Sequence, residues 1–398
     1  MRTLRPWIPV GKNNTSQESS LRRRLVLLSA IVLLAPLVAG SARAESGWTN
    51  LNPPASPSQR VGHAIAYDSR ADRMLMFGGN TGDSIFSIVD ETWSFDFETN
   101  AWTNLNPTIS PSPRVGHAMA YDSRADRMIV FGGASQGAFV GDTWAYDFNT
   151  NVWANLNPTI SPSPRSGHAM AYDSQADRPI VFGGGTQGGF ASDTWAYDFN
   201  TNVWANLSSL GHPSARILHS MVYDSLSART VIFGGYASDV HWTNQTWAYA
   251  YFTNTWTNLT PAASPSPRVS HAMAYNVRSD RTILFGGDIS VLTGNNETWS
   301  YDLDANVWTE MHPTTSPPAR AEHAMVYDTR ADRILMFGGR FEGPADPGGT
   351  WSYPSGRSPS PGMPWVPLLI FTAILAGVPI LYMVWRRRRK RRSTSSEG

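Results

Sequence analysis

Apolar and polar residues follow one another in short runs along most of the chain, and the same order of runs returns about every 50 residues. In one copy, residues 117–121 alternate with a period of two, which predicts a β-strand buried on both faces. A polar turn at 122–126 separates it from a second apolar run at 128–131, and runs at 143–146 and 152–156 predict two further strands. No copy has the 3.6-residue period of a helix. The repeated unit is therefore four short antiparallel strands.

Three motifs mark each copy: an Arg-x-x-His peptide opens the first strand, a Gly-Gly pair ends the second, and a Thr-Trp pair opens the third. The arginines are Arg60, Arg114, Arg165, Arg216, Arg268 and Arg320, and the histidines are His63, His117, His168, His219, His271 and His323. The glycine pairs are Gly78 and Gly79, Gly132 and Gly133, Gly183 and Gly184, Gly234 and Gly235, Gly286 and Gly287, and Gly338 and Gly339. Two glycines together permit positive φ or close backbone approach to the next sheet. Six such copies predict a β-propeller of stacked blades.

These motifs resemble kelch repeats, and the resemblance covers residues 47–353. It implies an all-β, six-bladed kelch-type β-propeller of the galactose-oxidase-like central domain superfamily, with the histidine strand innermost and the second-tryptophan strand outermost. The last copy has no fourth strand, whereas residues 47–51 match residues 101–105 of the first complete copy. We therefore expect the N-terminal strand to close the last blade, which leaves no open sheet edge.

The N-terminal flank predicts export. Arg22–Arg24 precede an apolar run from Leu25 to Gly40, and Ala42-Arg-Ala44 is a small-x-small cleavage site. Residues 1–44 are therefore interpreted as a signal peptide, and the propeller as residues 45–353. An uncleaved anchor is the alternative, although 16 apolar residues are short for a membrane span.

The C-terminal flank predicts a membrane anchor. Residues 365–385 are apolar and bracketed by tryptophans, and an arginine-rich run follows. This pattern favours a single transmembrane helix with residues 386–398 as a basic cytoplasmic tail and the propeller extracellular or periplasmic. Residues 354–364, rich in Pro, Ser and Gly, form a short stalk. A C-terminal sorting tail that is later removed is the alternative.

Charge and cysteine content narrow the partners. Between residues 45 and 385 there are 18 arginines, no lysine and 29 carboxylates, a formal charge near −11. An acidic surface argues against nucleic acid as a partner. The chain has no cysteine, which excludes disulfides, thiolate metal sites and cysteine nucleophiles. Kelch-type rings include copper radical oxidases resembling galactose oxidase, whose tyrosine–cysteine crosslink this chain cannot form.

The repeated arginines and histidines gather at the starts of the inner strands. A ring of imidazoles could bind a metal or titrate with pH, but one histidine per blade favours packing and hydrogen bonding between blades. We therefore expect the histidines and glycine pairs to be structural, the arginines to hold an anionic ligand, and no metal or cofactor. Asp147-x-Asn149-x-Asn151 resembles half of a calcium loop but lacks its later glycine and glutamate; such residues also cap turns.

The loop after each Gly-Gly pair varies while the rest of the copy stays nearly fixed, which is typical of a recognition surface on a rigid scaffold. Aromatic residues in these loops are candidate ligand anchors. They are Tyr236, His241 and Trp242 in the fourth copy, with Phe86, Phe139, Phe190 and Phe341 in others.

The sequence therefore predicts a cell-surface propeller that binds a protein or glycan ligand on its loop face. A carbohydrate-active enzyme that uses the Arg/His face is the alternative, and a structural envelope component is a second one.

Overall fold

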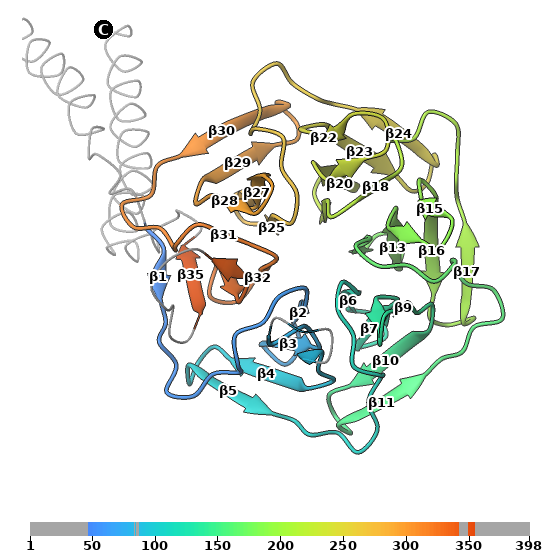
Figure 1. Ribbon diagram of the computed structural model, residues 1–398, viewed down its shortest axis with the longest axis vertical. Helices are drawn as coiled ribbons and strands as arrows, with labels where there is room; N and C mark the ends of the chain where they lie inside the picture. Colours follow the sequence, from blue (N-terminus) through green and yellow to red (C-terminus); the bar gives the residue numbers. More distant parts are fainter. Residues whose placement is uncertain (1–46, 83, 85–86, 342–348, 355–398) are drawn as a thin grey trace, which may run out of the picture. The chain divides into compact units, whose positions relative to one another are not determined.

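The computed structural model describes residues 47–82, 84, 87–341 and 349–354. Within this part of the chain, six four-stranded antiparallel sheets stand around a central axis as the blades of a propeller (Figure 1). The predictions of an all-β fold and of six blades are confirmed. The predicted signal peptide, stalk, transmembrane helix and tail lie outside the described residues, apart from Pro354. No helix long and apolar enough to cross a membrane occurs within the described ranges.

Each blade runs outward from the axis in the order of its strands. Blade 1 contains β2 (Ala64–Asp68), β3 (Arg73–Phe77), β4 (Thr92–Asp96) and β5 (Ala101–Asn104). Blade 2 contains β6 (Ala118–Asp122), β7 (Arg127–Phe131), β10 (Thr143–Asp147) and β11 (Val152–Asn155). Blade 3 contains β12 (Ala169–Asp173), β13 (Arg178–Phe182), β16 (Thr194–Asp198) and β17 (Val203–Asn206).

The second half of the ring repeats this order. Blade 4 contains β19 (Ser220–Asp224), β20 (Arg229–Phe233), β23 (Thr246–Ala250) and β24 (Thr255–Asn258). Blade 5 contains β25 (Ala272–Asn276), β26 (Arg281–Phe285), β29 (Thr298–Asp302) and β30 (Val307–Met311). Blade 6 contains β32 (Ala324–Asp328), β33 (Arg333–Phe337), β35 (Thr350–Pro354) and β1 (Thr49–Asn50).

The predicted strands of blade 2 agree with the observed ones to within one residue at each end. The loops after the Gly-Gly pairs differ from the prediction, because most of them contain short strands too brief to give a periodic signal. These are β8 (Ala134–Ser135) with β9 (Ala138–Phe139), β14 (Gly185–Thr186) with β15 (Gly189–Phe190), β21 (Tyr236–Ala237) with β22 (His241–Trp242), β27 (Asp288–Ser290) with β28 (Thr293–Gly294), and β34 (Arg340–Phe341). Two further short strands at the repeated arginines pair with these loops, β18 (Arg216–Ile217) with β21 and β31 (Arg320–Ala321) with β34.

The blades are held together by the two apolar faces of every sheet. In β7, Met128 and Val130 pack toward blade 1, whereas Val181 of blade 3 packs on Ile129 and Phe131 from the other side. The same alternation produces six buried clusters, one at each interface between neighbouring blades. Each large side chain removed from water contributes about 1.5–3 kcal/mol. The core is therefore a ring of six interfaces, which explains why the inner strands have apolar residues on both faces.

A buried hydrogen bond also joins each pair of neighbouring blades. The indole Nε1 of Trp153 in blade 2 donates to Thr92 Oγ1 in blade 1 at 3.0 Å. The equivalent donors and acceptors are Trp204 and Thr143, Trp256 and Thr194, Trp308 and Thr246, Trp48 and Thr298, and Trp102 and Thr350. The second tryptophan and the threonine of the Thr-Trp motif are thus the two halves of one interblade contact.

The first glycine of each pair lies where the next blade comes close. Gly78 has a φ of 66°, and a Cβ there would lie 2.8 Å from the carbonyl oxygen of Arg114 in blade 2. The neighbouring Gly79 N–H donates to that same carbonyl at 2.9 Å. Any side chain at Gly78 would have to displace backbone, so the glycine pair is a requirement of blade contact, as predicted.

A closed cycle of backbone hydrogen bonds surrounds the axis. Gly116 N–H donates to the Gly62 carbonyl at 2.8 Å, and each following blade donates to the one before it until Gly62 N–H reaches the Glu322 carbonyl at 3.3 Å. We call the six residues of this cycle the mouth ring; they are Gly62, Gly116, Gly167, Leu218, Ser270 and Glu322. All six have a positive φ, which side chains rarely adopt.

The N-terminal strand closes the ring, as the sequence predicted. β1 pairs with β35, with Thr49 opposite Ser352, and completes the sheet of blade 6. Trp48, just before β1, is 2 % exposed and packs within the interface of blades 5 and 6. Residues from the two ends of the propeller therefore share one blade, which leaves no unpaired edge at the seam.

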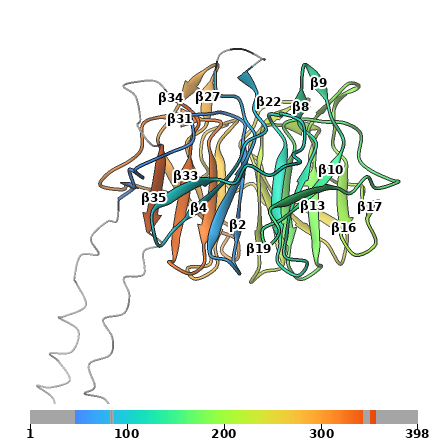
Figure 2. The ribbon, with the colours of Figure 1, turned by 90° about the horizontal axis from the view of Figure 1, so that it is seen from below.

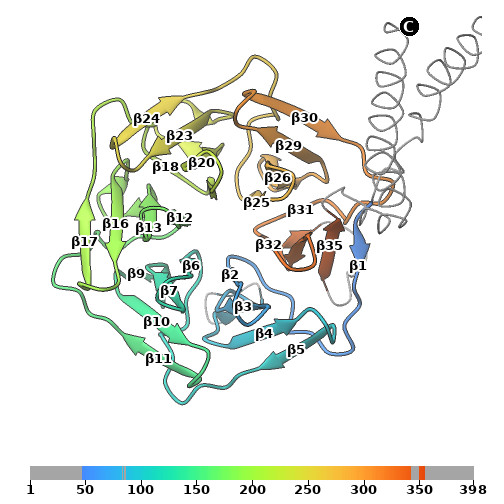
Figure 3. The same cartoon turned by 180° about the vertical axis from the view of Figure 1, so that it is seen from behind.

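The propeller has two different faces, seen edge-on in Figure 2. The short strands β8, β9, β22, β27, β31 and β34 lie at one end, here called the hairpin face, and the turns between the first and second strands of the blades lie at the other, here called the turn face. Figure 3 shows the six blades from behind the view of Figure 1.

Candidate ligand-binding face

Each repeated arginine is a clamp inside its own blade. Arg114 donates from Nη1 to the Gly132 carbonyl and from both terminal nitrogens to Asp142, at 2.8 Å for each carboxylate oxygen. Its Nε donates to the Ser112 carbonyl at 3.0 Å. Arg165 repeats the bidentate pair with Asp193, while Arg60 and Arg268 each contact a glutamate, Glu91 and Glu297. The clamp ties the start of the inner strand to the Gly-Gly pair and to the third strand.

The expected ligand-binding role of these arginines requires correction. Arg60, Arg114, Arg165, Arg216, Arg268 and Arg320 are all 0–1 % exposed. Their guanidinium groups contact carbonyls and side chains of their own blades, so no exposed guanidinium stands at these positions for an anion. A buried cation needs such partners because desolvation is costly. Sequence reasoning placed the arginines at the right end of the strands but could not see that, in blades 1, 2, 3 and 5, the acidic residue before the Thr-Trp pair reaches them.

In four blades a carboxylate neutralises the charge of the buried arginine. Burial alone would raise the pKa of Asp142, but the hydrogen bonds and charge of Arg114 outweigh burial and hold the pKa below its usual value. In blade 4 the acid is replaced by Gln245, whose Oε1 accepts from Arg216 Nη2 at 2.6 Å. Burial lowers the pKa of Arg216 to about 10, and only the more distant Asp239 opposes that shift. Blade 4 therefore has a buried arginine with a neutral clamp partner.

The six histidines are buried and pack between blades. The ring of His117 lies edge-on to Phe77 of blade 1 with 5.4 Å between centroids, and all six histidines are 5–6 % exposed. A phenylalanine carbonyl of the preceding blade acts on each ring, but within the described residues no ring nitrogen reaches strict hydrogen-bond geometry. Aromatic packing is therefore the main interblade contact of these histidines.

Burial controls the charge of these histidines. It lowers the pKa of His63 to about 3, helped by the nearby Arg60 and partly offset by the Phe337 carbonyl. Burial, with Arg165 nearby, also lowers the pKa of His168 to about 3, and the other four are shifted in the same direction. The rings are thus neutral at physiological pH.

The partial calcium motif of blade 2 forms a turn and a contact between blades. Asp147 Oδ1 accepts from the Asn149 N–H at 2.8 Å, and Asn151 donates to the Leu105 carbonyl of blade 1 at 2.7 Å while accepting from the Tyr146 hydroxyl. Asn151 has a φ of 56°, which asparagine tolerates. No group of three or more metal-ligating side chains gathers within the described part of the chain.

The predicted aromatic anchors of blade 4 lie together on the hairpin face. Tyr236 and Trp242 are paired across the β21–β22 hairpin, and the ring of His241 lies 5.3 Å from that of Tyr236. Phe190 of blade 3 meets Tyr236 edge-on at 5.9 Å. Phe139 of blade 2 is 42 % exposed and lies beside Gly185 of blade 3. These contacts build an aromatic crescent across blades 2–4, defined here as Phe139, Phe190, Tyr236, His241 and Trp242.

The remaining aromatic candidates are placed differently. Phe341 lies in β34 of blade 6, opposite Arg320, outside the aromatic crescent. Phe86 is outside the described residues.

Sequence reasoning missed a charged group on the same face. Arg340 directly follows the last Gly-Gly pair and contacts Asp288 of blade 5 at 2.7 Å and Glu322 at 3.8 Å. Burial raises the pKa of Glu322, while Arg340 partly offsets the shift. The sequence could have indicated this ion pair, because Asp288 and Arg340 occupy the same position after the Gly-Gly pairs of successive blades.

The mouth ring is unequal around the axis. Blades 1–3 contribute glycines, whereas blades 4–6 contribute Leu218, Ser270 and Glu322. Leu218 is 38 % exposed and has a φ of 58°. Non-glycine residues in this conformation are costly by roughly 1–2 kcal/mol each and concentrate at functional sites. The mouth ring therefore has no side chains where blades 1–3 contribute to it, and it has three where blades 4–6 contribute.

The neutral clamp of blade 4 gives a stability prediction. Gln245→Glu supplies Arg216 with the carboxylate that the clamps of blades 1, 2, 3 and 5 have, so we expect the free energy of unfolding to rise by about 1–2 kcal/mol and Tm by a few degrees. Glu297→Gln, the reverse change in blade 5, is the matched control and is expected to lower Tm. Thermal unfolding followed by circular dichroism measures both, and a Gln245→Glu midpoint at or below that of the parent would contradict the clamp.

The buried histidines predict sensitivity to acid. Unfolded histidines take up protons as pH falls through about 6.5, whereas the folded ones remain neutral to much lower pH, so the unfolded state binds more protons and stability falls with pH. Each histidine contributes a slope of up to about 1.4 kcal/mol per pH unit. We expect Tm to fall steeply between about pH 6.5 and pH 5, and His117→Gln to reduce that slope by about one proton. A flat Tm across this range would show that the histidines do not titrate on unfolding.

Comparison with known proteins agrees with this architecture. The KLHDC2/KLHL20/DRC7 Kelch-repeats domain matches residues 43–223 and 159–339. Adagio protein 3 of Arabidopsis thaliana is 27% identical, and the match covers 67% of this chain and 45% of that protein. The leucine-zipper-like transcriptional regulator 1 homolog of Drosophila melanogaster is 25% identical, and the match covers 71% of this chain and 30% of that protein. Tip elongation aberrant protein 3 of Schizosaccharomyces pombe is 31% identical over 38% of this chain and 16% of its own. The chain thus spans less than half of the length of each of these relatives. With the domain match covering most of the chain, the protein belongs to the kelch-repeat family.

Proposed function

We propose that this protein is a cell-surface kelch propeller whose hairpin face binds a peptide segment of a partner protein. The kelch-repeat relatives suggest a protein-interaction module. The observation that carries the proposal is the concentration of exposed apolar side chains in the segments after the Gly-Gly pairs. They are Phe139, Phe190, Val240, Ile289, Val291 and Leu292, each 39 to 80 % exposed.

The composition of this face fits a peptide. The aromatic crescent on blades 2–4 supplies large apolar contact surfaces of the kind that dominate binding energy. On blades 5 and 6, Asp288, Arg340 and Glu322 offer charges of both signs, which suits the polar main chain and charged side chains of a peptide. The bare glycine side of the mouth ring leaves backbone accessible beside them. A structural envelope component would need none of these features.

An enzymatic role on carbohydrate is the alternative, and one observation favours it. Glu322 stands at the mouth with a raised pKa caused mainly by burial, as a general acid requires. Its carboxylate is nevertheless within 3.8 Å of Arg340, a contact that opposes protonation. Binding therefore remains the better-supported function.

Peptide selection tests the binding proposal. Random peptides displayed on phage are selected on the purified protein, and binders are then measured against Tyr236→Ala and Phe190→Ala. We expect each variant to weaken binding about 10-fold or more, because truncated aromatic anchors typically cost over 1 kcal/mol. Ile160→Ala, at a residue 54 % exposed in a connection between blades, is the control and should leave binding unchanged. If the selected peptides bind both crescent variants as tightly as the parent protein, the assignment of the binding face is wrong. A parallel glycan array shows whether the protein binds sugars instead.

The surface location is part of the same proposal and rests on the sequence of the two flanks. The apolar span at 365–385 and the arginines after it favour a cytoplasmic C-terminus. We expect protease added to intact cells to remove the propeller while an epitope placed after Arg392 stays protected. Digestion of that epitope from outside would reverse the assigned orientation.

A further inference from the structure

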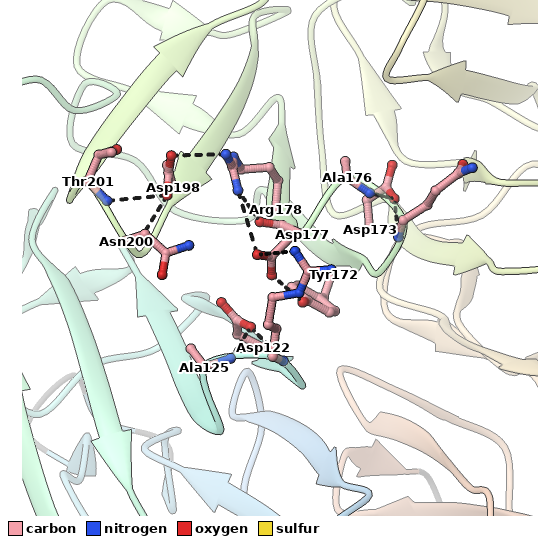
Figure 4. Close-up of polar contacts among 12 residues, drawn as sticks. Asp122, Ala125, Tyr172, Asp173, Ala176, Asp177, Arg178, Asp198, Asn200 and Thr201 are labelled. Carbon is pink, nitrogen blue, oxygen red and sulfur yellow. Dashed lines mark hydrogen bonds and ion pairs between the residues drawn. The ribbon is translucent and has the colours of Figure 1, made fainter.

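The turn face carries a repeated polar network that Figure 4 shows in blade 3. The Tyr172 hydroxyl donates to Asp177 Oδ1 at 2.7 Å, and Arg178 pairs with Asp198 at 2.9 Å. Arg124 of blade 2 reaches across to Asp177 at 3.2 Å. The tyrosine–aspartate bond recurs in blades 1, 2, 5 and 6, as Tyr67 with Asp72, Tyr121 with Asp126, Tyr275 with Asp280, and Tyr327 with Asp332.

Blade 4 has lost this network at four positions at once. Compared with blade 2, Leu226 replaces Arg124, Ala228 replaces Asp126, Ala250 replaces Asp147 and Phe252 replaces Asn149. Each change substitutes an apolar residue for a polar one. Leu226 is 62 % exposed and Phe252 is 69 % exposed, so the new side chains do not enter the core.

The loss leaves three polar groups of the turn face without their repeat partners. The buried Tyr223 hydroxyl has no hydrogen-bond partner, since Ala228 stands where the other blades have aspartate. Arg229 precedes Thr230, which pairs with Tyr249, so Ala250 stands where Asp147 stands beside Arg127 in blade 2, and Arg229 forms no ion pair within the described ranges. Asp280 of blade 5 accepts from Tyr275 but has no arginine, because its neighbour in the ring is Leu226.

These positions form one continuous patch. In blade 2, Asn149 donates to Asp126 at 3.3 Å, which shows that the positions of Phe252 and Ala228 are adjacent. The pair between Arg124 and Asp177 likewise shows that the position of Leu226 faces the aspartate of the next blade. We call Leu226, Ala228, Arg229, Phe252 and Asp280 the blade-4 patch.

We propose that the blade-4 patch binds the same patch of a second copy of this chain. The patch has an exposed apolar centre flanked by the guanidinium of Arg229 and the carboxylate of Asp280, neither of which forms an ion pair within the described ranges. Asp304 of blade 5 adjoins it and accepts from the Ser227 hydroxyl at 3.2 Å. A two-fold axis would bring Arg229 of each copy to Asp280 of the other and bury Leu226 and Phe252 between them, so the surface is complementary to itself. A foreign partner of a single charge would satisfy only one of the two groups. The patch is small, so the association is weak and reversible.

This surface is separate from the peptide-binding function. It lies at the opposite end of the blades from the aromatic crescent, so two copies joined through it keep both hairpin faces open. Self-association would then raise the apparent affinity for a partner that offers two binding segments.

Sedimentation velocity of the purified full chain in mild detergent tests the proposal over a concentration series from about 1 to about 500 µM. We expect a concentration-dependent dimer. Leu226→Arg and Phe252→Asn restore residues found in other blades, so they should preserve the fold and weaken the dimer at least about 10-fold. Leu210→Ser, at a residue 99 % exposed outside the patch, is the control and should leave the dimer unchanged.

Charge reversal identifies the two-fold contact itself. Arg229→Glu and Asp280→Lys should each abolish the dimer alone, because each places like charges together. An equimolar mixture of the two variants should dimerise again, since one copy then supplies both carboxylates and the other both cations. A protein that stays monomeric at every concentration, a dimer that survives Leu226→Arg, or a mixture that fails to associate while both variants keep the parental Tm would each overturn the proposal.

Discussion

Closure of the ring is the constraint on which the rest of this structure depends. Every sheet is apolar on both faces, so no blade can be stable in water without a neighbour on each side. The buried hydrogen bond from tryptophan to threonine also makes each blade depend on its neighbour. An indole N–H buried without its acceptor would lower the stability of the fold by about 1–3 kcal/mol. At the seam, Trp102 reaches Thr350 and Trp48 reaches Thr298. Residues 248 and 250 positions apart in the sequence are therefore joined by the same contact as any other pair of blades.

This constraint explains why the repeated polar residues are structural. The arginine clamp, the packed histidine and the glycine pair all shape a blade or fit it to the next one. The two binding surfaces that we propose lie at positions that the ring does not need, which are the segments after the glycine pairs and the turns at the opposite end. The aromatic crescent and the Asp288–Arg340–Glu322 group occupy such positions.

Blade 4 departs from its neighbours at both ends. On the hairpin face it contributes Tyr236, His241 and Trp242 and a clamp with Gln245 in place of an acid. On the turn face it has an apolar patch where the others have charges. A ring tolerates such a blade because its two interfaces remain intact, as the buried clusters with blades 3 and 5 show. Blade 4 thus differs from its neighbours at both ends while its core contacts stay the same.

The fold could be predicted from the amino-acid sequence, because short-range patterns suffice for a structure built from repeats. Alternation placed the strands and the glycine pairs marked their ends. The match of residues 47–51 with residues 101–105, together with the missing fourth strand of the last copy, indicated the closing strand. The contacts of the polar residues could not be predicted in this way, because they depend on how the strands and blades pack. Whether Arg216 faces solvent or lies buried depends on Gln245, 29 residues further along, and the mouth ring joins blades through backbone groups that carry no sequence signal. The blade-4 patch likewise became visible only when Leu226 and Asp280 were placed side by side by ring packing, since charge pairing across blades is a property of the assembled ring and not of any single repeat.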